Sequence, residues 1–415
     1  MLDNTRRGFL KTTAAASAAF LTPKFASGAL GANDRVRIAM IGVGSRGQEL
    51  LKQIVAVPQT EVVAIADVYT RRFEEAKQIA PAIQTFDDYR RVLDMKDIDG
   101  VIVATPLHIH ARHFVDTLAA GKDLYAEKTM TWSIPEAEKC LDAAHKSDRV
   151  IQIGLQHESG GPFIDAKKWI SAGMLGKVNQ VESWMSRNTP HGHGQWVRQP
   201  AADCTPKNVG WQAFLNGRPD KGFDAYRFMN WRLFWMFSGG NITENMIHQI
   251  AWIMSALDLP LPSAAYMCGG IFSEKDGREV PDTIAVTLDF PDEVVVTWQS
   301  TFSNRRYGLG QRILGSDGTI EYVAGATDMV RGESEEQVHY YPEKLNRPDG
   351  SEIAGSSPTI NHMANWVECM RSRKTPNAPV ELGYRSAVAA HMANLSYRQQ
   401  RRISLEEAKA FKPEY

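Results

Sequence analysis

Three side chains of this sequence, Lys128, Glu244 and His248, are of the types that hold and move protons. A lysine whose pKa is lowered by desolvation or by a neighbouring cation can take the proton of a hydroxyl group. Lys128 follows Asp123–Ala126, which predicts a buried strand, and its alternative role is a surface ion pair with Glu127. Glu244 and His248 are four residues apart in a helical segment and share one face, although a helical histidine is often a satisfied core residue. The residue types predict proton transfer at a hydroxyl group.

A glycine-rich turn follows the first apolar run of the chain. Val36–Ile41 predicts a strand, and Gly42, Gly44 and Gly47 follow it in the order G-x-G-x-x-G, ahead of a helical segment at 48–55. The first glycine allows the tight turn, the second lets the backbone approach a pyrophosphate, and the third lets the helix pack closely on the strand. The N–H groups at the start of the helix would bind that phosphate. The order predicts a dinucleotide site.

A carboxylate stands where such a site needs one. Asp67 ends a second strand-like run, Glu61–Ala66, and lies 20 residues after Gly47. A carboxylate at this place accepts hydrogen bonds from the adenosine ribose diol. It would repel a 2'-phosphate and so favours NAD, whereas Arg71 and Arg72 nearby would also allow NADP.

Strand-like and helical segments alternate up to residue 154. Further strands are predicted at 97–105, 123–126 and 149–154, and helices at 71–80, 111–120 and 133–146. This alternation predicts a parallel sheet with helices on both faces. Ligands of such sheets bind at the carboxyl ends of the strands, where Thr105, Pro106, His108, His110 and Glu127 would lie.

The pattern changes after Gln156. Helices are predicted at 162–172, 241–256, 360–372 and 383–399, and strands at 177–187, 264–272, 283–290, 294–302 and 311–314. A long polar and aromatic stretch, 188–240, has few periodic signals, and such stretches are usually functional. We predict an α/β protein in which a Rossmann dinucleotide-binding domain at 34–155 precedes a C-terminal α/β domain at 156–415. The sheet of the second domain would be open and mostly antiparallel.

The N-terminus has the pattern of a twin-arginine signal peptide. Arg6-Arg7 lies within the run Thr5–Lys11, and a mildly apolar run at 12–21, too short to span a bilayer, precedes small residues at 22–29. We expect a signal peptide at 1–33 and a periplasmic or secreted protein; the alternative is a disordered basic tail. The twin-arginine pathway exports folded proteins, which suits a chain that captures its cofactor in the cytoplasm. No other segment approaches the length of a membrane span, so no stable membrane insertion is expected.

The composition of the chain excludes some classes of partner and site. Lys and Arg total 47 against 48 for Asp and Glu, so no basic field for nucleic acid is expected. The four cysteines are far apart, and the sequence implies neither a metal site nor a disulfide framework, a single long-range disulfide being the remaining alternative. His191 and His193 lack a third ligand at metal spacing, and we expect them to line a polar sugar site.

Four motifs together resemble those of the Gfo/Idh/MocA oxidoreductase family. They are the glycine turn with Asp67, the segment ATPLHIH at 104–110, Glu127-Lys128-Thr129, and Gly239-Gly240 followed by Glu244 and His248. The resemblance extends from about residue 34 onward. It implies a dinucleotide-binding domain followed by an α/β domain with an open antiparallel sheet, and redox chemistry on sugars, inositols or related polyols. It also implies a homo-oligomer formed through the C-terminal domain.

The resemblance assigns roles to single positions. Lys128 matches the proton-relaying lysine and His248 the catalytic histidine, and we expect Glu244 to orient that histidine. Glu244 stands where the family usually has an aspartate, Thr129 replaces the usual proline, and Ala251 replaces a second aspartate.

These observations define the expected site. The expected cofactor contacts are Gly42, Gly44, Ser45, Arg46, Gly47, Asp67, Thr105, Pro106, His108, His110, Glu127, Lys128 and Gln156, and the expected substrate contacts are His157, His191, His193, Arg232 and Trp235. The leading hypothesis is an exported NAD(P)-dependent oxidoreductase for a sugar, polyol or glycoside. Its cofactor would be tightly bound, because free nicotinamide is scarce outside the cytoplasm. The alternatives are an NAD-dependent glycoside hydrolase that uses transient oxidation at C3 and elimination, and a non-catalytic sugar-binding protein, which the substitutions at Glu244 and Ala251 favour.

Overall fold

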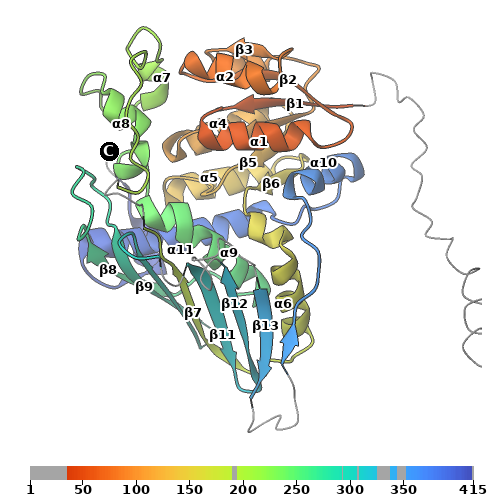
Figure 1. Cartoon of the computed structure of the whole chain (residues 1–415), viewed down its shortest axis with the longest axis vertical. Helices are drawn as coiled ribbons and strands as arrows, with labels where there is room; N and C mark the ends of the chain where they lie inside the picture. The colour runs from red at the N-terminus through yellow and green to blue at the C-terminus, as the bar shows by residue number, and fades with distance from the viewer. Residues whose placement is uncertain are drawn as a thin grey trace, which may run out of the picture. The chain divides into compact units, whose positions relative to one another are not determined.

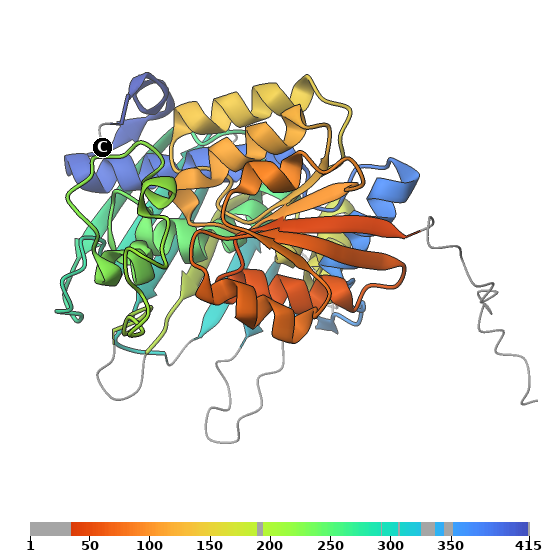
Figure 2. The ribbon, with the colours of Figure 1, turned by 90° about the horizontal axis from the view of Figure 1, so that it is seen from above.

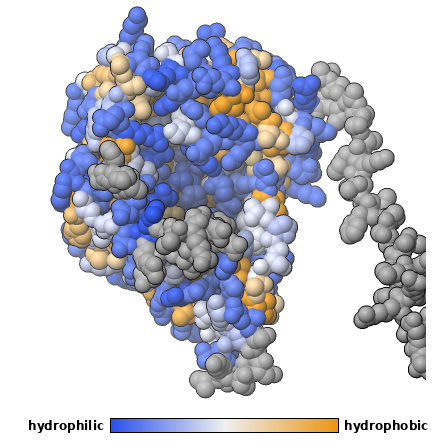
Figure 3. Space-filling model, in the orientation of Figure 1, coloured by the Kyte–Doolittle hydropathy of each residue, from blue (hydrophilic) through white to orange (hydrophobic). Residues whose placement is uncertain are grey.

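The computed structural model of the protein describes residues 35–188, 194–291, 293–305, 308–324, 337–343 and 352–413. From Val36 onward the chain forms one unit, and two β-sheets organise it (Figure 1). The expected signal segment and the histidines His191 and His193 lie outside the described residues. Among the described helices, none is long and apolar enough to cross a membrane. The face of the molecule in Figure 3 is mostly hydrophilic.

The first sheet has six parallel strands in the order β3-β2-β1-β4-β5-β6 (Figure 1). The strands are β1 Val36–Ile41, β2 Thr60–Ala66, β3 Gln84–Phe86, β4 Gly100–Val103, β5 Asp123–Ala126 and β6 Ile151–Ile153. Every residue of β4, β5 and β6 is buried, as expected for parallel strands covered on both faces. The strand order is that of a doubly wound dinucleotide-binding sheet, so the predicted fold class is confirmed for this part of the chain.

Helices lie on both faces of this sheet. They are α1 Ser45–Val55, α2 Arg71–Ile79, α3 Tyr89–Leu93, α4 His110–Ala119 and α5 Ile134–His145. In Figure 2, α1 and α2 (red to orange) lie on one face and α4 and α5 (orange to yellow) on the other. The start of α5 is fixed by its own sequence, because the Ser133 hydroxyl accepts a hydrogen bond from Glu136 N.

The second sheet has nine strands in the order β14-β13-β12-β11-β7-β10-β9-β8-β15. The strands are β7 Val178–Met185, β8 Ala264–Gly270, β9 Thr283–Phe290, β10 Val294–Thr301, β11 Leu309–Gly315, β12 Gly318–Ala324, β13 Gln337–Pro342, β14 Ile353–Ala354 and β15 Ile403–Ser404. All the described neighbours are antiparallel except β7 and β10, which confirms the prediction of a mostly antiparallel sheet. Sequence reasoning missed β12 to β15. Strands β14 and β15 have only two residues each, too few to show an alternating pattern.

Three helices accompany this sheet and connect it to the first one (Figure 1). They are α6 Gly161–Ser171, α9 Ile247–Ala256 and α11 Val380–Gln399. Helix α11 contacts α5 of the first layer as well as α9 and β8 of the second. The buried Trp298 indole of β10 donates to Gln249 Oε1 of α9 at 2.7 Å, which fixes the helix on the sheet.

A late segment completes the core of the first sheet. Helix α10, His362–Ser372, buries Trp366 and Met370 beneath Gly100 of β4, where an added Cβ would lie 2.7 Å from the Met370 methyl. The His362 carbonyl accepts a hydrogen bond from the buried Gln152 of β6 at 2.7 Å. The core on this face of the dinucleotide-binding sheet is therefore completed by residues from a much later part of the chain.

The described part of the long stretch after β7 folds around its aromatic residues. It contains the short helices α7 Trp211–Leu215 and α8 Ala225–Met229, and Phe214 is fully buried among aromatic neighbours. The stretch is attached to the first sheet just after Asp67, since Gly210 N donates to Val68 O at 2.7 Å. This attachment places it beside the glycine turn.

Candidate active site

The glycine turn between β1 and α1 has the geometry that a pyrophosphate needs. Gly42 has a φ of 86°, which favours glycine, and a Cβ on Gly47 would lie 2.3 Å from the Gly42 carbonyl oxygen. A Cβ on Gly44 would meet no atom within 4 Å, so this backbone faces open space at the start of α1. Thr105 closes the turn from β4, because a Cβ at Gly42 would lie 2.7 Å from its methyl group. The fit to a bound phosphate is good.

Asp67 is oriented toward this turn. Its Oδ2 accepts from Val43 N at 2.8 Å and its Oδ1 from Tyr69 N at 2.9 Å. Burial raises the pKa of the Asp67 carboxyl, and the two N–H groups oppose that rise. The carboxylate lies at the end of β2, where an adenosine ribose would bind.

The two arginines that would allow a 2'-phosphate are engaged elsewhere. Arg72 pairs with Glu75 at 2.5 Å, and Arg71 pairs with Glu75 at 3.3 Å and with Asp203 at 2.7 Å. Their charges are therefore balanced by carboxylates close to Asp67.

Sequence reasoning did not identify Arg198, which lies at the glycine turn. Its guanidinium donates to Ser45 Oγ at 2.6 Å, and its backbone N–H and C=O both bond the buried Asn230 side chain. Arg198 belongs to the stretch 188–240, and the length of that stretch was the signal that could have led to it. It adds a cation where the phosphates would bind.

Several expected cofactor contacts form one buried polar group behind the turn. Glu127 Oε1 accepts from Arg46 Nε at 2.9 Å and from Gln156 Nε2 at 3.2 Å, and Gln156 also donates to the Tyr125 hydroxyl at 3.0 Å. The Glu127 side chain is 5% exposed. The group links α1, β5 and the segment after β6. Glu127 therefore stabilises the elements of the site through buried hydrogen bonds.

His108 and His110 need correction as cofactor contacts. His110 is buried, and its two ring nitrogens bond Thr129 O at 2.8 Å and Thr105 O at 2.7 Å. His108 is also buried, and its Nε2 bonds Phe214 O at 2.6 Å. Pro106 starts the short turn that turns these rings inward. The two histidines hold the backbone of the site together, and they present no ring nitrogen to its surface.

Lys128 lies at the centre of the site. Its Nζ donates to the Glu244 carbonyl at 2.8 Å and to Glu244 Oε2 at 3.3 Å, and its side chain is 13% exposed. Arg232 donates to the same Oε2 at 3.0 Å. Burial opposes ionisation of Glu244, but Arg232 and Lys128 lower its pKa to about 2. The surface pairing of Lys128 with Glu127 is not formed.

The predicted role of Glu244 is different in the structure. Glu244 bonds Lys128 and Arg232, and among the described contacts His248 Nδ1 has no hydrogen-bond partner. Glu244 lies in a π-helix, Ile242–Met246, and α9 begins at Ile247. Two cations from other segments, Lys128 and Arg232, bond the Glu244 carboxylate instead of His248. Glu244 positions Lys128.

His248 is held in its neutral form. Burial lowers its pKa well below 6.5, and the nearby Lys128, His157 and Arg187 lower it further. The His157 ring lies 5.3 Å from the His248 ring and stacks on Phe163 at 4.6 Å. A neutral imidazole beside Lys128 can accept a proton, which is the chemistry expected of this position.

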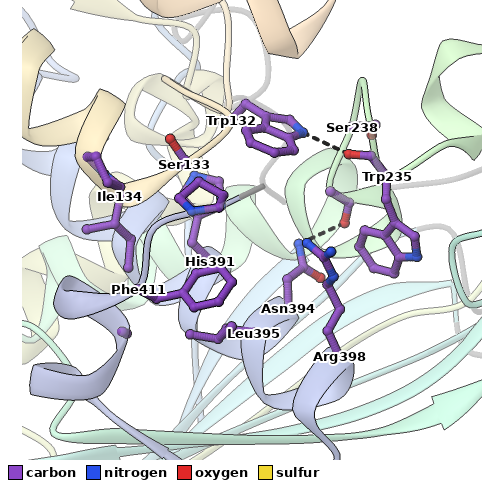
Figure 4. A pocket seen from close by; sticks show the side chains of 14 residues that line it. Trp132, Ser133, Ile134, Trp235, Ser238, His391, Asn394, Leu395, Arg398 and Phe411 are labelled. Carbon is purple, nitrogen blue, oxygen red and sulfur yellow. Dashed lines mark hydrogen bonds between the residues drawn. The ribbon is translucent and has the colours of Figure 1, made fainter. Parts of the chain in front are cut away.

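The last two expected substrate contacts, Arg232 and Trp235, lie at different places in the structure. Arg232 lies on Glu244, with its guanidinium 4.2 Å from the centre of the Trp231 ring. Trp235 instead lines a separate pocket with Trp132, Asn394 and Arg398 (Figure 4). Lys128, Glu244 and His248 do not line it.

No group of side chains within the described ranges could hold a metal ion, and all four cysteines are free.

Comparison with known proteins adds the following findings. Residues 36–155 match "Oxidoreductase family, NAD-binding Rossmann fold", and residues 217–405 match "Oxidoreductase family, C-terminal alpha/beta domain". A glycosyl hydrolase family 109 protein of Shewanella baltica is 26% identical over 226 residues, which are 46% of this chain and 49% of that protein. The chain thus spans about half the length of the curated relatives it matches.

Two solved structures are similar over most of their length. The aldose-aldose oxidoreductase of Caulobacter crescentus, complexed with glycerol, has a TM-score of 0.67 at 18% identity, covering 89% of this chain and 99% of that one. The WlbA dehydrogenase of Bordetella pertussis, in complex with NADH and UDP-GlcNAcA, has a TM-score of 0.68 at 17% identity, covering 89% and 98%. At these identities the likeness concerns the fold.

Proposed function

Because the chain belongs to the Gfo/Idh/MocA oxidoreductase family, we propose that it is an NAD(H)-dependent oxidoreductase acting on a sugar, polyol or glycoside. The observation that carries the proposal is the juxtaposition of Lys128, bonded to Glu244, with the neutral His248. Lys128 follows the carboxyl end of β5, where substrates of such sheets bind, and Glu244 and His248 lie on the π-helix and on α9.

The residues present fit a dinucleotide. Gly44 and Ser45 would hold the pyrophosphate together with Arg198, and Asp67 would hold the ribose. The ion pairs of Arg71 and Arg72 favour NAD over NADP. When bound, the nicotinamide supplies the acceptor for a hydride.

The protein's own residues supply the proton chemistry. His248, neutral at pH 7, would accept the proton of the reacting hydroxyl, while the Lys128 ammonium hydrogen-bonds the oxygen as negative charge develops on it. Glu244 positions Lys128 through the two contacts from its Nζ. Arg232 fixes the far side of that carboxylate.

We further propose export by the twin-arginine pathway with a tightly bound cofactor. The support is the sequence Thr5-Arg6-Arg7-Gly8-Phe9-Leu10-Lys11. A cofactor that is reduced and reoxidised in one cycle would not depend on a free pool, as in an enzyme that couples two sugars.

Homo-oligomerisation is part of this proposal, and its support is the exposed Tyr266 and Val295 on strands of the open sheet. Light scattering of the purified protein would test it.

A second candidate is a glycoside hydrolase that oxidises C3 transiently and eliminates the aglycone from C1. The observation in its favour is the similarity to the glycosyl hydrolase family 109 protein. The same base could remove the C2 proton, which the adjacent ketone acidifies. Product analysis separates the two candidates, since only the second releases an aglycone.

The decisive experiment is to purify the exported protein without added cofactor, denature it and identify any nucleotide released. About one NAD per chain would support the closed cycle. A Lys128→Ala variant should keep the nucleotide and lose turnover. Unchanged turnover in this variant would remove the proposed relay, and a protein that neither holds nor binds NAD would favour the non-catalytic sugar-binding alternative.

A further inference from the structure

Arg187 is a cation of the site that no motif identifies. It lies two residues after the end of β7, and its backbone N–H donates to Thr301 O at 2.9 Å. Two residues earlier, Met185 O accepts from Ser300 Oγ at 2.6 Å, and that hydroxyl accepts from Asn241 Nδ2 at 2.7 Å. Asn241 precedes the π-helix that carries Glu244. These bonds fix the end of β7 beside the helix of the catalytic residues.

Among the described residues, the guanidinium of Arg187 has only a weak hydrogen-bond acceptor. It is half-buried, and its one hydrogen bond to the described residues goes to Met185 Sδ at 3.6 Å. A thioether is a weak acceptor, whereas a guanidinium has five N–H donors arranged for a planar oxyanion. No described carboxylate lies within ion-pair distance of it, in contrast to Arg46 and Arg232, which pair with Glu127 and Glu244.

The charges of the site do not balance. Lys128 and Arg232 share the single carboxylate of Glu244, and Arg187 is attracted to the same carboxylate from further away. Three cations therefore face one anion. Arg187 and Lys128 both act on His248, so the excess positive charge lies where the substrate would bind. A site of this kind favours a ligand that brings its own negative charge.

The phosphates of the cofactor do not account for Arg187. The cations at the glycine turn are Arg46 and Arg198, the latter bonded to Ser45. Arg187 instead follows β7, whose last residue is linked through Ser300 and Asn241 to the start of the helix that carries Glu244. We infer that the substrate is an acidic sugar, and that Arg187 binds its carboxylate as the residue that determines this specificity. The inference rests on the proposed function, because it concerns the same site.

The test uses matched pairs of sugars with the full-length, NAD-loaded protein. D-glucuronate is compared with D-glucose and D-galacturonate with D-galactose, and glucose 6-phosphate serves as the phosphate arm. Turnover is followed by NADH absorbance, and binding of the same compounds by calorimetry. The variants are Arg187→Gln, Arg187→Lys and, as a matched control, Arg402→Gln, an exposed arginine paired with Asp289.

We expect at least one uronate to be preferred over its neutral partner. Arg187→Gln should lower kcat/KM or affinity for that uronate by at least about 30-fold, mainly through KM, and Arg187→Lys should restore part of it. Arg402→Gln should change neither value. A preference for the neutral sugars, an acid preference that survives in Arg187→Gln, or the absence of acid-selective binding across the panel would overturn the inference. A preference for the phosphate alone would assign the oxyanion to a sugar phosphate and would also overturn it.

Failure of the proposed function gives a different result. A protein that binds no NAD but binds a uronate in an Arg187-dependent way would keep the acidic-sugar site and lose the redox role. A protein that binds NAD and oxidises neutral sugars alone would keep the redox role and lose the acidic-sugar site.

Discussion

Replacing Glu244 with glutamine should destabilise the protein in a pH-dependent way. The pKa of Glu244 falls from an ordinary 4.5 to about 2, where burial opposes the fall and Arg232 and Lys128 cause it. The side chain is 10% exposed, so solvent screens these ion pairs little. The difference corresponds to about 3 kcal/mol in favour of the ionised, folded state. Glu244→Gln should lower the free energy of unfolding by about this amount at pH 7.

The sign of the pH dependence follows from the lowered pKa. A carboxyl group that ionises more readily in the folded state stabilises the protein fully above about pH 4.5, and this contribution is lost as the pH falls toward 2. The difference between the wild type and Glu244→Gln should therefore shrink to about 1 kcal/mol at pH 3.

Urea unfolding of the cofactor-free protein, followed by tryptophan fluorescence at pH 7 and pH 3, measures both quantities. Glu321→Gln is the matched control, because Glu321 pairs with the half-exposed Arg312 and such surface pairs contribute at most about 1 kcal/mol. A difference below about 1 kcal/mol for Glu244→Gln at pH 7, or one that is the same at both pH values, would refute the electrostatic reasoning.

Three further predictions concern the cofactor and the base. Gly47→Ala should lower the stability of the protein by about 1–3 kcal/mol, because the added Cβ would lie 2.3 Å from the Gly42 carbonyl oxygen. Gly44→Ala should fold normally but bind NAD more weakly. Thermal melts measure the first effect and NAD titrations the second. Asp67→Ala should weaken NAD binding by about tenfold in a fluorescence titration, and unchanged affinity would remove Asp67 from the ribose site. His248→Asn should lower kcat by roughly 10²–10⁴-fold with little change in NAD affinity. Since burial and nearby cations hold the pKa of His248 well below 6.5, kcat/KM of the wild type should not fall between pH 8 and 6.5 through this group, and a fall there that disappears in His248→Asn would contradict its neutral state.

The features that could be predicted from the sequence are those set by neighbours in the chain. The turn at Gly42 and the carboxylate of Asp67 depend on short runs of residues, so strand, turn and acid follow from the local pattern. The direction in which a side chain points at the end of a strand cannot be predicted from its neighbours in the chain. His110 turns inward because Thr129 offers a carbonyl from the segment after β5, and His108 does so because Phe214 offers one from a distant helix.

The contacts of the catalytic residues were also beyond the local pattern. The four-residue spacing predicts an interaction between Glu244 and His248, but Lys128 and Arg232 reach the carboxylate from other segments and bond it instead. Arg187 follows no motif at all, and it becomes visible only when the end of β7 is placed beside that helix. Predictions based on spacing fail here because they do not include partners from other parts of the chain.

The packing of α10 against the first sheet has a consequence for biosynthesis. The strands of that sheet are synthesised first, but Trp366 and Met370, which cover Gly100, are made only after every strand of the second sheet except β15. The nascent dinucleotide domain therefore keeps an uncovered apolar face until α10 has been synthesised. We expect NAD capture to follow the synthesis of α10, so that a chain truncated before α10 would be retained by chaperones or degraded rather than loaded.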